Sequence, residues 1–419
     1  MSGVKYLVMV TTNNNNKYYK MIPHGDTFTV EYGRLGQSSF QTASYPMSQF
    51  HKKYREKVNK GYVDRTELIA ELVEEVKPET KDDEPQYAPI PNEIVAEIVK
   101  RLQDMAKKTI EANYKISSTM VTQKMVDESQ WCLNQLAKAK TVEAFNKILL
   151  ENFSIISRRM GNVNDWLATS KDEFEKIIER EQDLLDVMAG QVRQHDIDKK
   201  AQQKKEKASS DNKPVKKTTI MKAMGIDIKP ITKKEEAEIK KRLGSDAHRF
   251  VRAWRVKNKK TQKAFDEFIA AQEEGFETKL LWHGSRNENW WSIITTGLVL
   301  KPTNVVISGK MFGYGIYFAP EAGKAIGYTS TRGAYWTSGT ANTGFISLYD
   351  IAYGKPYIID KNYYSYTGLS SLDAKKLAEV APGCNSLHAL KGVTGLRRDE
   401  VIVYNENQAT IKYLVEVSM

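Results

Sequence analysis

The chain has 419 residues, of which 41% are hydrophobic and 27% charged, so length and composition predict several folded domains rather than a disordered protein. Its two cysteines, Cys132 and Cys384, are too few for a disulfide framework or a cysteine-rich zinc finger. The sequence has no apolar run near the roughly 20 residues of a membrane span and no signal-peptide pattern, so we expect an intracellular protein without a membrane partner. The net charge of +11 favours a polyanionic partner such as nucleic acid, although a solvated basic surface produces the same balance.

Residues 1–72 are predicted to form a small β-rich module with one helix. Aromatic and β-branched residues predict three strands, at Tyr6–Val10, Lys17–Ile22 and Thr27–Tyr32. A repeat of apolar residues at every fourth position then predicts a helix over Ser48–Lys60, which Gly61 is placed to end.

The middle of the chain is predicted to be helical. An acidic, proline-punctuated stretch over 74–91 is typical of a linker. Residues 88–195 then carry apolar side chains at helical spacing, which predicts an all-helical domain. The lysine-rich stretch Asp198–Lys217 is expected to be a second, exposed linker, with a nuclear-import signal as the alternative.

Residues 216–419 have a different texture, with frequent glycine and short β-type runs that predict an α+β domain built on antiparallel strands. This domain lacks a strand–GxGxxG–helix unit, so a dinucleotide-binding fold of the Rossmann type is not expected. The predicted fold class is therefore a multidomain α+β protein, with a β-rich module, an all-helical domain and an antiparallel α+β domain.

Three clusters in the last domain point to chemistry, and they are LLWHGSR at 280–286, MFGYGIYFA at 311–319 and DEVIVY at 399–404. Glycine beside a histidine or a tyrosine lets a ligand approach the backbone closely, and paired tyrosines can sandwich a flat ring. Each cluster alone is more often structural: a packed histidine, a turn with aromatic residues, or a solvated strand-edge carboxylate.

In this order, however, the three clusters resemble the catalytic domain of the poly(ADP-ribose) polymerase family over about residues 230–419. The resemblance implies transfer of ADP-ribose from NAD with release of nicotinamide, and it expects no metal. It places the family's His–Tyr–Glu triad at His283, Tyr317 and Glu400.

The same resemblance implies how NAD is held. His283 would bond a ribose hydroxyl, Gly284 would offer its backbone to the nicotinamide amide, and Ser285 would hold the ribose or its phosphate side. Tyr317 and Tyr328 would stack on the nicotinamide ring.

Glu400 would stabilise the oxocarbenium-like transition state and polarise an acceptor hydroxyl. Lys324 would orient the acceptor or a phosphate. Two positions depart from the family pattern: Ala325 replaces a serine that bonds the nicotinamide amide, and Val299 replaces an arginine on the adenosine side.

The N-terminal module resembles the WGR domain of the DNA-dependent members of this family. The likeness lies in Lys17–Lys20 and in Tyr32-Gly33-Arg34, where a tyrosine replaces the name-giving tryptophan. It implies that Tyr32 stacks on a sugar or base at a DNA end or nick, and that Arg34, Lys52 and Lys53 meet phosphates. The helical block resembles the family's regulatory domain, most clearly at Asp183–Asp186.

We therefore expect a poly-ADP-ribosyltransferase that DNA breaks activate and that modifies proteins, itself included. It would be nuclear in a eukaryote and nucleoid-associated otherwise. The alternatives are a mono-ADP-ribosyltransferase, a DNA-end-binding scaffold with a weakened transferase site, and an enzyme regulated by RNA.

Overall fold

The structure is a computed structural model, and it describes residues 3–35, 39–68, 87–114, 121–210, 217–300, 311–329, 342–360, 368–392 and 395–419. Side chains at 202 and 204–210 are not described. Contacts divide the chain into two compact units. Among the described residues, the first unit holds 3–68 and 108–195, and the second holds 87–107, 196–300 and 311–419.

The first unit begins with a five-stranded sheet in the order β4-β3-β2-β1-β5. Its strands are β1 (Lys5–Thr11), β2 (Asn15–His24), β3 (Thr27–Arg34), β4 (Gln41–Pro46) and β5 (Val63–Asp64), and all neighbours are antiparallel. The three predicted strands lie within β1, β2 and β3, and the predicted helix became α1 (Phe50–Asn59). This confirms the β-rich N-terminal module.

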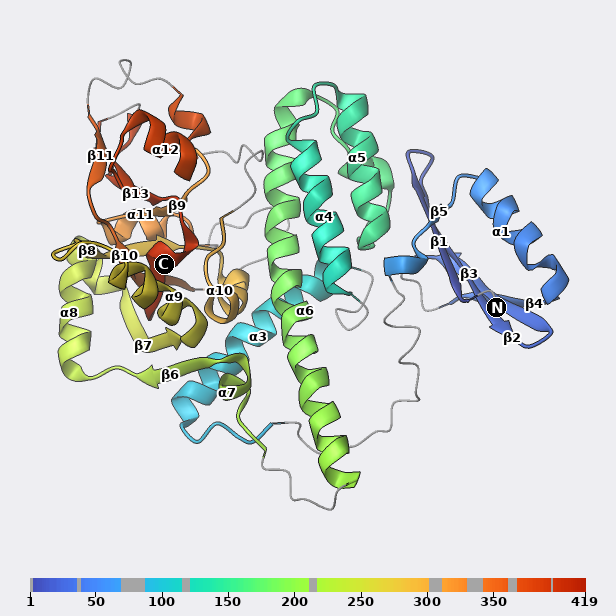
Figure 1. Cartoon of the computed structure of the whole chain (residues 1–419), viewed down its shortest axis with the longest axis horizontal. Helices are drawn as coiled ribbons and strands as arrows, with labels where there is room; N and C mark the ends of the chain where they lie inside the picture. The colour runs from blue at the N-terminus through green and yellow to red at the C-terminus, as the bar shows by residue number, and fades with distance from the viewer. Residues whose placement is uncertain are drawn as a thin grey trace. The chain divides into compact units, whose positions relative to one another are not determined.

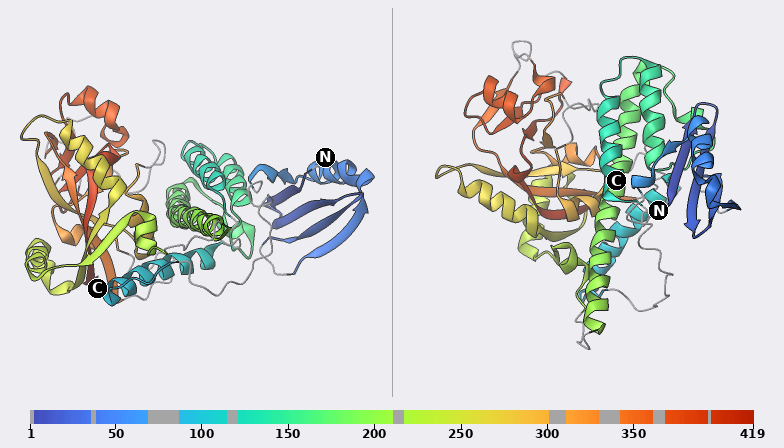
Figure 2. Two further views of the ribbon diagram at one scale, coloured as in Figure 1. Left: turned by 60° about the horizontal axis from the view of Figure 1, so that its bottom comes forward. Right: turned by 45° about the vertical axis from the view of Figure 1, so that its right-hand side comes forward.

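Helix α1 lies along one face of this sheet, as Figure 2 shows. The buried Phe50 ring of α1 meets Phe28 of β3 edge-on, with 5.0 Å between ring centroids. Leu7, Met21 and Val30 complete the core between helix and sheet. Aromatic and aliphatic side chains therefore hold α1 against this face of the sheet.

The helical segment contains α3 (Glu93–Asn113), α4 (Gln123–Leu136), α5 (Val142–Ile155) and α6 (Phe174–Ser210). Thr122 and Thr141 cap α4 and α5 by accepting from the backbone N–H groups of Met125 and Ala144. The expected linker over Asp198–Lys217 is wrong in its first part, because α6 continues to Ser210. Alanine, glutamine, lysine and glutamate fill this stretch, and all four favour a helix. Residues 211–216 lie outside the described part.

A buried ion pair fixes the loop after α5 to helix α6. Arg158 Nη2 lies 2.9 Å from Glu181 Oε2, and the two side chains are 1% and 2% exposed. The guanidinium also sits 4.3 Å from the centroid of the Tyr114 ring. Burial opposes ionisation of Glu181, but Arg158 and Arg180 outweigh it and hold the carboxyl pKa below its ordinary value.

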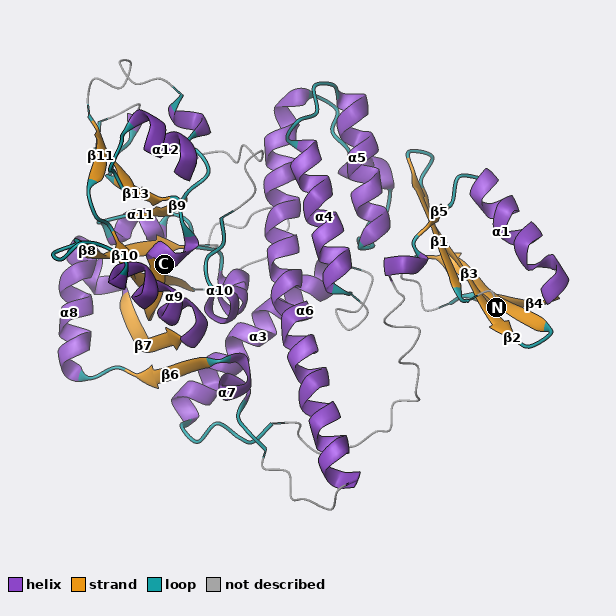
Figure 3. Ribbon diagram, viewed as in Figure 1, coloured by secondary structure: helices purple, strands orange, loops and turns teal. Residues whose placement is uncertain are grey.

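The second unit is built on two sheets (Figures 1 and 3). The five-stranded sheet has the order β6-β7-β14-β10-β8, with every pair antiparallel. Its strands are β6 (Ile226–Pro230), β7 (Phe250–Asn258), β8 (Thr278–Gly284), β10 (Thr343–Ala352) and β14 (Ala409–Ser418). The four-stranded sheet has the order β11-β12-β13-β9, made by β9 (Ile316–Phe318), β11 (Pro356–Ile359), β12 (Ser386–Ala389) and β13 (Glu400–Val403). Only β11 and β12 pair in parallel among these strands, so the predicted antiparallel α+β domain is confirmed.

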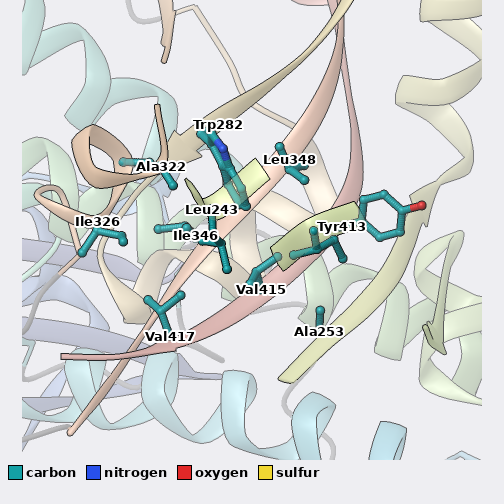
Figure 4. Packing of buried hydrophobic residues seen from close by; sticks show 12 residues of the cluster. Leu243, Ala253, Trp282, Ala322, Ile326, Ile346, Leu348, Tyr413, Val415 and Val417 are labelled. Carbon is teal, nitrogen blue, oxygen red and sulfur yellow. The ribbon is translucent and has the colours of Figure 1, made fainter. Parts of the chain in front are cut away.

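Helices surround these sheets and complete the core. They are α7 (Ile220–Met224), α8 (Lys233–Leu243), α9 (Lys259–Ala270), α10 (Trp290–Thr296), α11 (Ala322–Ile326) and α12 (Ala374–Val380). Figure 4 shows Trp282 of β8 among Ile346 and Leu348 of β10, with Ala322 and Ile326 of α11 beside them. This core fixes α11 against the strand that carries the histidine of the first motif.

Helix α3 contributes its first half to the second unit. Arg101 of α3 donates to the buried Glu416 of β14 at 2.6 Å and to Thr343 Oγ1 at 2.8 Å. Glu97 accepts two bonds of 3.2 Å from Arg252 of β7. Charged side chains thus hold residues 87–107 against the interior strands β7, β14 and β10 of the five-stranded sheet.

Candidate active site

Strands β8 and β9 meet through their backbones, and this contact brings the first two motifs together. Trp282 and Ala319 exchange two backbone hydrogen bonds of 2.8 Å. One residue on, His283 Nδ1 lies 2.9 Å from the carbonyl oxygen of Tyr317. Because a carbonyl only accepts, Nδ1 must carry the proton of this bond, and in the neutral ring Nε2 is then an acceptor.

Gly284 ends strand β8 at a place that has no room for a side chain. A Cβ built there would lie 2.0 Å from the carbonyl oxygen of Ala325 on α11. Real Cβ atoms essentially never come this close to another heavy atom. The glycine is therefore required for β8 and α11 to approach each other beside His283.

The hydroxyl of Tyr317 is occupied by the loop that precedes β9. It accepts from the N–H of Phe312 at 3.0 Å and donates to the carbonyl oxygen of Gly313 at 3.0 Å. Burial raises the pKa of this phenol far above its ordinary value. The Tyr317 hydroxyl is therefore held in its protonated form by burial and by two backbone partners.

Tyr328 and Ser285 each follow an element that carries another predicted site residue, α11 with Lys324 and β8 with His283. Tyr328 follows α11 directly, where its N–H donates to the Ala325 carbonyl at 3.1 Å, and its side chain is 55% exposed. Ser285 Oγ accepts from Asn289 Nδ2 at 3.2 Å. Val299, at the position where the family pattern has an arginine, is 53% exposed.

Glu400 begins strand β13 and is buried, at 3% exposure. Its Oε1 forms an ion pair with Lys324 Nζ of α11, while its Oε2 is buried and has no hydrogen-bond partner within the described residues. Burial raises the pKa of this carboxyl above its ordinary value, although the Lys324 ammonium favours the charged form. The arrangement leaves one carboxylate oxygen able to accept a bond from a bound molecule.

Four of the predicted residues of the catalytic domain form two direct pairs, and Gly284 lies against the helix that carries Lys324. His283 bonds Tyr317, Lys324 pairs with Glu400, and Gly284 abuts Ala325. Sequence reasoning missed the polar contacts of Asp399, the residue before Glu400. His388 Nε2 lies 3.1 Å from Asp399 Oδ2, and His388 Nδ1 lies 2.8 Å from Tyr353 Oη. A histidine eleven positions before a carboxylate gives no local signal of this contact.

A pocket of about 520 Å³ opens on the N-terminal module. Its lining includes Tyr18 and Tyr32, the cations Lys17 and Arg34, and Phe40, whose side chain is 53% exposed. Tyr62, which lies between α1 and β5, also lines it. The structure therefore brings Tyr32 and Arg34 together.

Lys52 and Lys53 lie on α1 and do not line this pocket. Lys53 Nζ sits 4.5 Å from the centroid of the Tyr45 ring and 3.9 Å from Glu56. Arg34 is also engaged, because its Nη2 donates to Asn14 Oδ1 at 3.1 Å and to the Gly161 carbonyl at 3.0 Å. That second bond joins the module to the loop after α5 and was not anticipated from the sequence.

Comparison with known proteins agrees with both motif groups. Residues 226–419 match the poly(ADP-ribose) polymerase catalytic domain, and residues 5–68 match the WGR domain. A putative poly(ADP-ribose) polymerase-like protein, 100L, of Invertebrate iridescent virus 6 is 32% identical over 164 residues, which cover 39% of this chain and 83% of that protein. This chain belongs to the poly(ADP-ribose) polymerase family.

Two further proteins are similar to this polymerase-family chain. The uncharacterized protein 101L of the same virus is 31% identical over 193 residues, covering 45% of this chain and 77% of that protein. Poly(ADP-ribose) polymerase 2 of Homo sapiens is 32% identical over 167 residues, covering 35% of this chain and 28% of the human protein.

As a member of the poly(ADP-ribose) polymerase family, the chain is an ADP-ribosyltransferase with NAD+ as its substrate, which confirms the expected class of enzyme. Within the described ranges, no three histidine, cysteine, aspartate or glutamate side chains gather as metal ligands would. None of the described helices is both long and apolar enough to cross a membrane.

Proposed function

We propose that this polymerase-family chain makes poly(ADP-ribose) on protein acceptors and that a nucleic-acid end activates it. The observation that carries the catalytic part is the buried Oε2 of Glu400, which has no partner among the described residues and stands beside the Lys324–Glu400 ion pair. A negative charge there can stabilise the positive charge that develops on ribose as nicotinamide leaves. The same oxygen can accept a bond from the ribose 2′-hydroxyl.

The residues around Glu400 suit the rest of NAD+. With its Nδ1 proton committed to Tyr317, neutral His283 has Nε2 as an acceptor for a ribose hydroxyl. The Gly284 backbone and the Tyr317 and Tyr328 rings would hold the nicotinamide amide and its flat face. Ser285 would contact the ribose or its phosphate side.

Chain elongation needs an acceptor hydroxyl that is made nucleophilic near the ribose carbon from which nicotinamide leaves. Glu400 can polarise that hydroxyl, and Lys324, 15% exposed, lies beside it at the edge of the site. This supports polymer formation, whereas single transfer requires only the donor half of the site.

The catalytic proposal is tested by Glu400→Gln, which keeps the shape of the side chain and removes its charge. We expect NAD+ to bind as before while labelled NAD+ no longer produces a polymer smear on a denaturing gel. The matched control is Glu379→Gln on the exposed face of α12. A single sharp band from the unaltered chain would instead indicate mono-ADP-ribosyl transfer. Long polymer from Glu400→Gln would show that another residue supplies the negative charge that stabilises the ribose cation.

The pocket on the N-terminal module carries the nucleic-acid part of the proposal. Tyr18, Tyr32 and Phe40 supply aromatic surfaces for a terminal base or sugar, and Lys17 and Arg34 supply charge for phosphates. Arg65 connects this module to the helical segment, since its Nη2 donates to Ser154 Oγ at 2.7 Å. A phosphate that engaged Arg34 would compete with the Gly161 carbonyl, and this gives the pocket a route to the helices.

Lys17→Ala tests this pocket more cleanly than Arg34→Ala, because Arg34 also holds Gly161. We expect Lys17→Ala to weaken activation by a short blunt or nicked duplex and to flatten the salt dependence of binding by about one phosphate contact. Equal loss in Lys52→Ala would extend the interface along α1. An unchanged salt slope in Lys17→Ala, or NAD+ turnover that no duplex stimulates, would contradict the proposal.

A further inference from the structure

Arg398, two residues before Glu400, reaches across helix α11. Its Nε donates to Glu321 Oε2 at 3.1 Å, and Glu321 occupies the N-cap position of α11 without a side-chain capping bond. The guanidinium lies over Gly323, where a Cβ would stand 2.7 Å from Nη2 and 2.8 Å from Cζ of Arg398. The same Cβ would stand 2.9 Å from Asp246 Oδ2. The absence of a side chain at Gly323 therefore lets the Arg398 guanidinium and the Asp246 carboxylate both approach α11.

The backbone of Arg398 faces the ion pair of the site. Its carbonyl oxygen lies 3.5 Å from Lys324 Nζ, which also pairs with Glu400 Oε1. Lys324 therefore touches the segment that leads into β13 at two points, one before Glu400 and one on Glu400 itself. Any movement of Arg398 away from α11 would therefore shift its carbonyl oxygen relative to Lys324 Nζ.

Asp399, between these two residues, is tied elsewhere. Its Oδ2 lies 3.1 Å from His388 Nε2 on β12, and its Oδ1 accepts from the N–H of Lys391 at 2.8 Å. Two side chains therefore connect α11 and its N-cap position to the residues that lead into Glu400: Lys324, and Arg398 through Glu321. The contact made by Arg398 is the element the sequence motifs did not reveal.

We propose that Arg398 is a positioning residue that holds the start of β13 against α11, so that Lys324 and Glu400 keep their register. Arg398 acts on Glu400 through Lys324, which its carbonyl oxygen contacts, rather than by touching NAD+. The inference rests on the proposed role of Glu400 in the reaction. Because its guanidinium is 41% exposed and Glu321 is 57% exposed, this ion pair contributes little to global stability. Replacing Arg398 should therefore leave the protein folded.

The test uses the full chain and measures kcat and KM for NAD+ separately. We expect Arg398→Ala to lower kcat about tenfold, since a small misplacement of a catalytic group is costly, and to leave KM within about twofold. Arg398→Lys, which keeps one charged contact with Glu321, should recover part of kcat. Arg397→Ala is the matched control, because Arg397 is its exposed neighbour in the sequence.

Two further variants separate positioning from a structural role. Gly323→Ala drives a methyl into the guanidinium without altering any charge and should lower kcat as Arg398→Ala does. In a Lys324→Met background, Arg398→Ala should have no further effect on kcat, because its route to Glu400 is gone.

Wild-type kcat in Arg398→Ala, or an additive loss in the Lys324→Met background, would overturn the inference. A parallel fall in kcat and melting temperature that Arg398→Lys does not repair would overturn it as well, since the residue would then be structural. If Glu400→Gln retains polymer synthesis, the proposed function fails first, whatever Arg398→Ala does.

Discussion

Arg101 of helix α3 donates a 2.6 Å hydrogen bond to Glu416 of strand β14, across 315 positions of the sequence. Glu416 is 2% exposed, and its other nearby cation, Arg252, has its Nε 3.5 Å from Oε2. Arg101 also places its guanidinium 5.0 Å from the centroid of the buried Phe345 ring. Arg101, which lies outside the catalytic motifs, therefore balances the negative charge of a buried carboxylate in the five-stranded sheet.

We expect Arg101→Met to lower the free energy of unfolding by about 1–3 kcal/mol, because the buried Glu416 carboxylate then keeps a single cation, the more distant Arg252, beside the Thr343 hydroxyl. Chemical denaturation monitored by tryptophan fluorescence measures this loss. Glu416→Gln in the same chain should restore much of it by removing the charge. If the double variant is no more stable than Arg101→Met, packing of α3 rather than charge compensation holds the helix there.

A chain beginning at residue 217 tests whether the helical segment restrains the transferase. Because this truncation also removes Arg101, we expect a lower melting temperature than in a chain that also retains residues 87–107, which include the first part of α3. With Glu416→Gln to relieve the uncompensated charge, the truncated chain should turn over NAD+ without nucleic acid, and faster than the unstimulated full chain. Equal rates for the two folded proteins would make the helices a spacer.

Lys324→Met should change the pH dependence of catalysis. Burial raises the pKa of Glu400, and Lys324 opposes that rise by favouring the carboxylate. Without the ammonium the pKa rises further, so the carboxylate is lost at a higher pH as the solution is acidified. The acid limb of kcat, measured at saturating NAD+, should therefore move to higher pH, whereas Lys375→Met on exposed α12 should not move it.

Gly284→Ala should disrupt the contact between β8 and α11. The added methyl would stand 2.0 Å from the Ala325 carbonyl, and because backbone atoms cannot swing aside, the strand or helix must shift. Overpacking of this kind costs about 1–3 kcal/mol, and we expect NAD+ binding by calorimetry to be lost as well. Gly161→Ala, which meets no atom within 4 Å, is the control. Normal NAD+ affinity in Gly284→Ala would show that this approach does not shape the site.

The order of the motifs around His283, Tyr317 and Glu400 predicted the family, because each motif is a short segment whose residues stay together in the fold. Strand and helix periodicity predicted the N-terminal module for the same reason. The contacts of Arg101 with Glu416 and of Arg398 with Glu321 join residues far apart in the sequence, and neither partner carries a local pattern. Helix α6 was missed beyond Asp198 because a run of lysines has the composition of a solvated linker and also a good helix propensity.

The Tyr317 hydroxyl, bonded at once to the N–H of Phe312 and the carbonyl of Gly313, sets a rule for how this site can diverge. Both partners are backbone atoms, so exchanging the side chain of Phe312 leaves the bonds available. One residue added or removed between Gly313 and Tyr317 would move the Phe312 nitrogen and the Gly313 oxygen out of reach of the hydroxyl. Among descendants of this sequence, we therefore expect the spacing between Phe312 and Tyr317 to be inherited as strictly as Gly313 and Gly315, where a Cβ would lie 2.2 Å and 2.1 Å from other atoms, and more strictly than the identity of Tyr314.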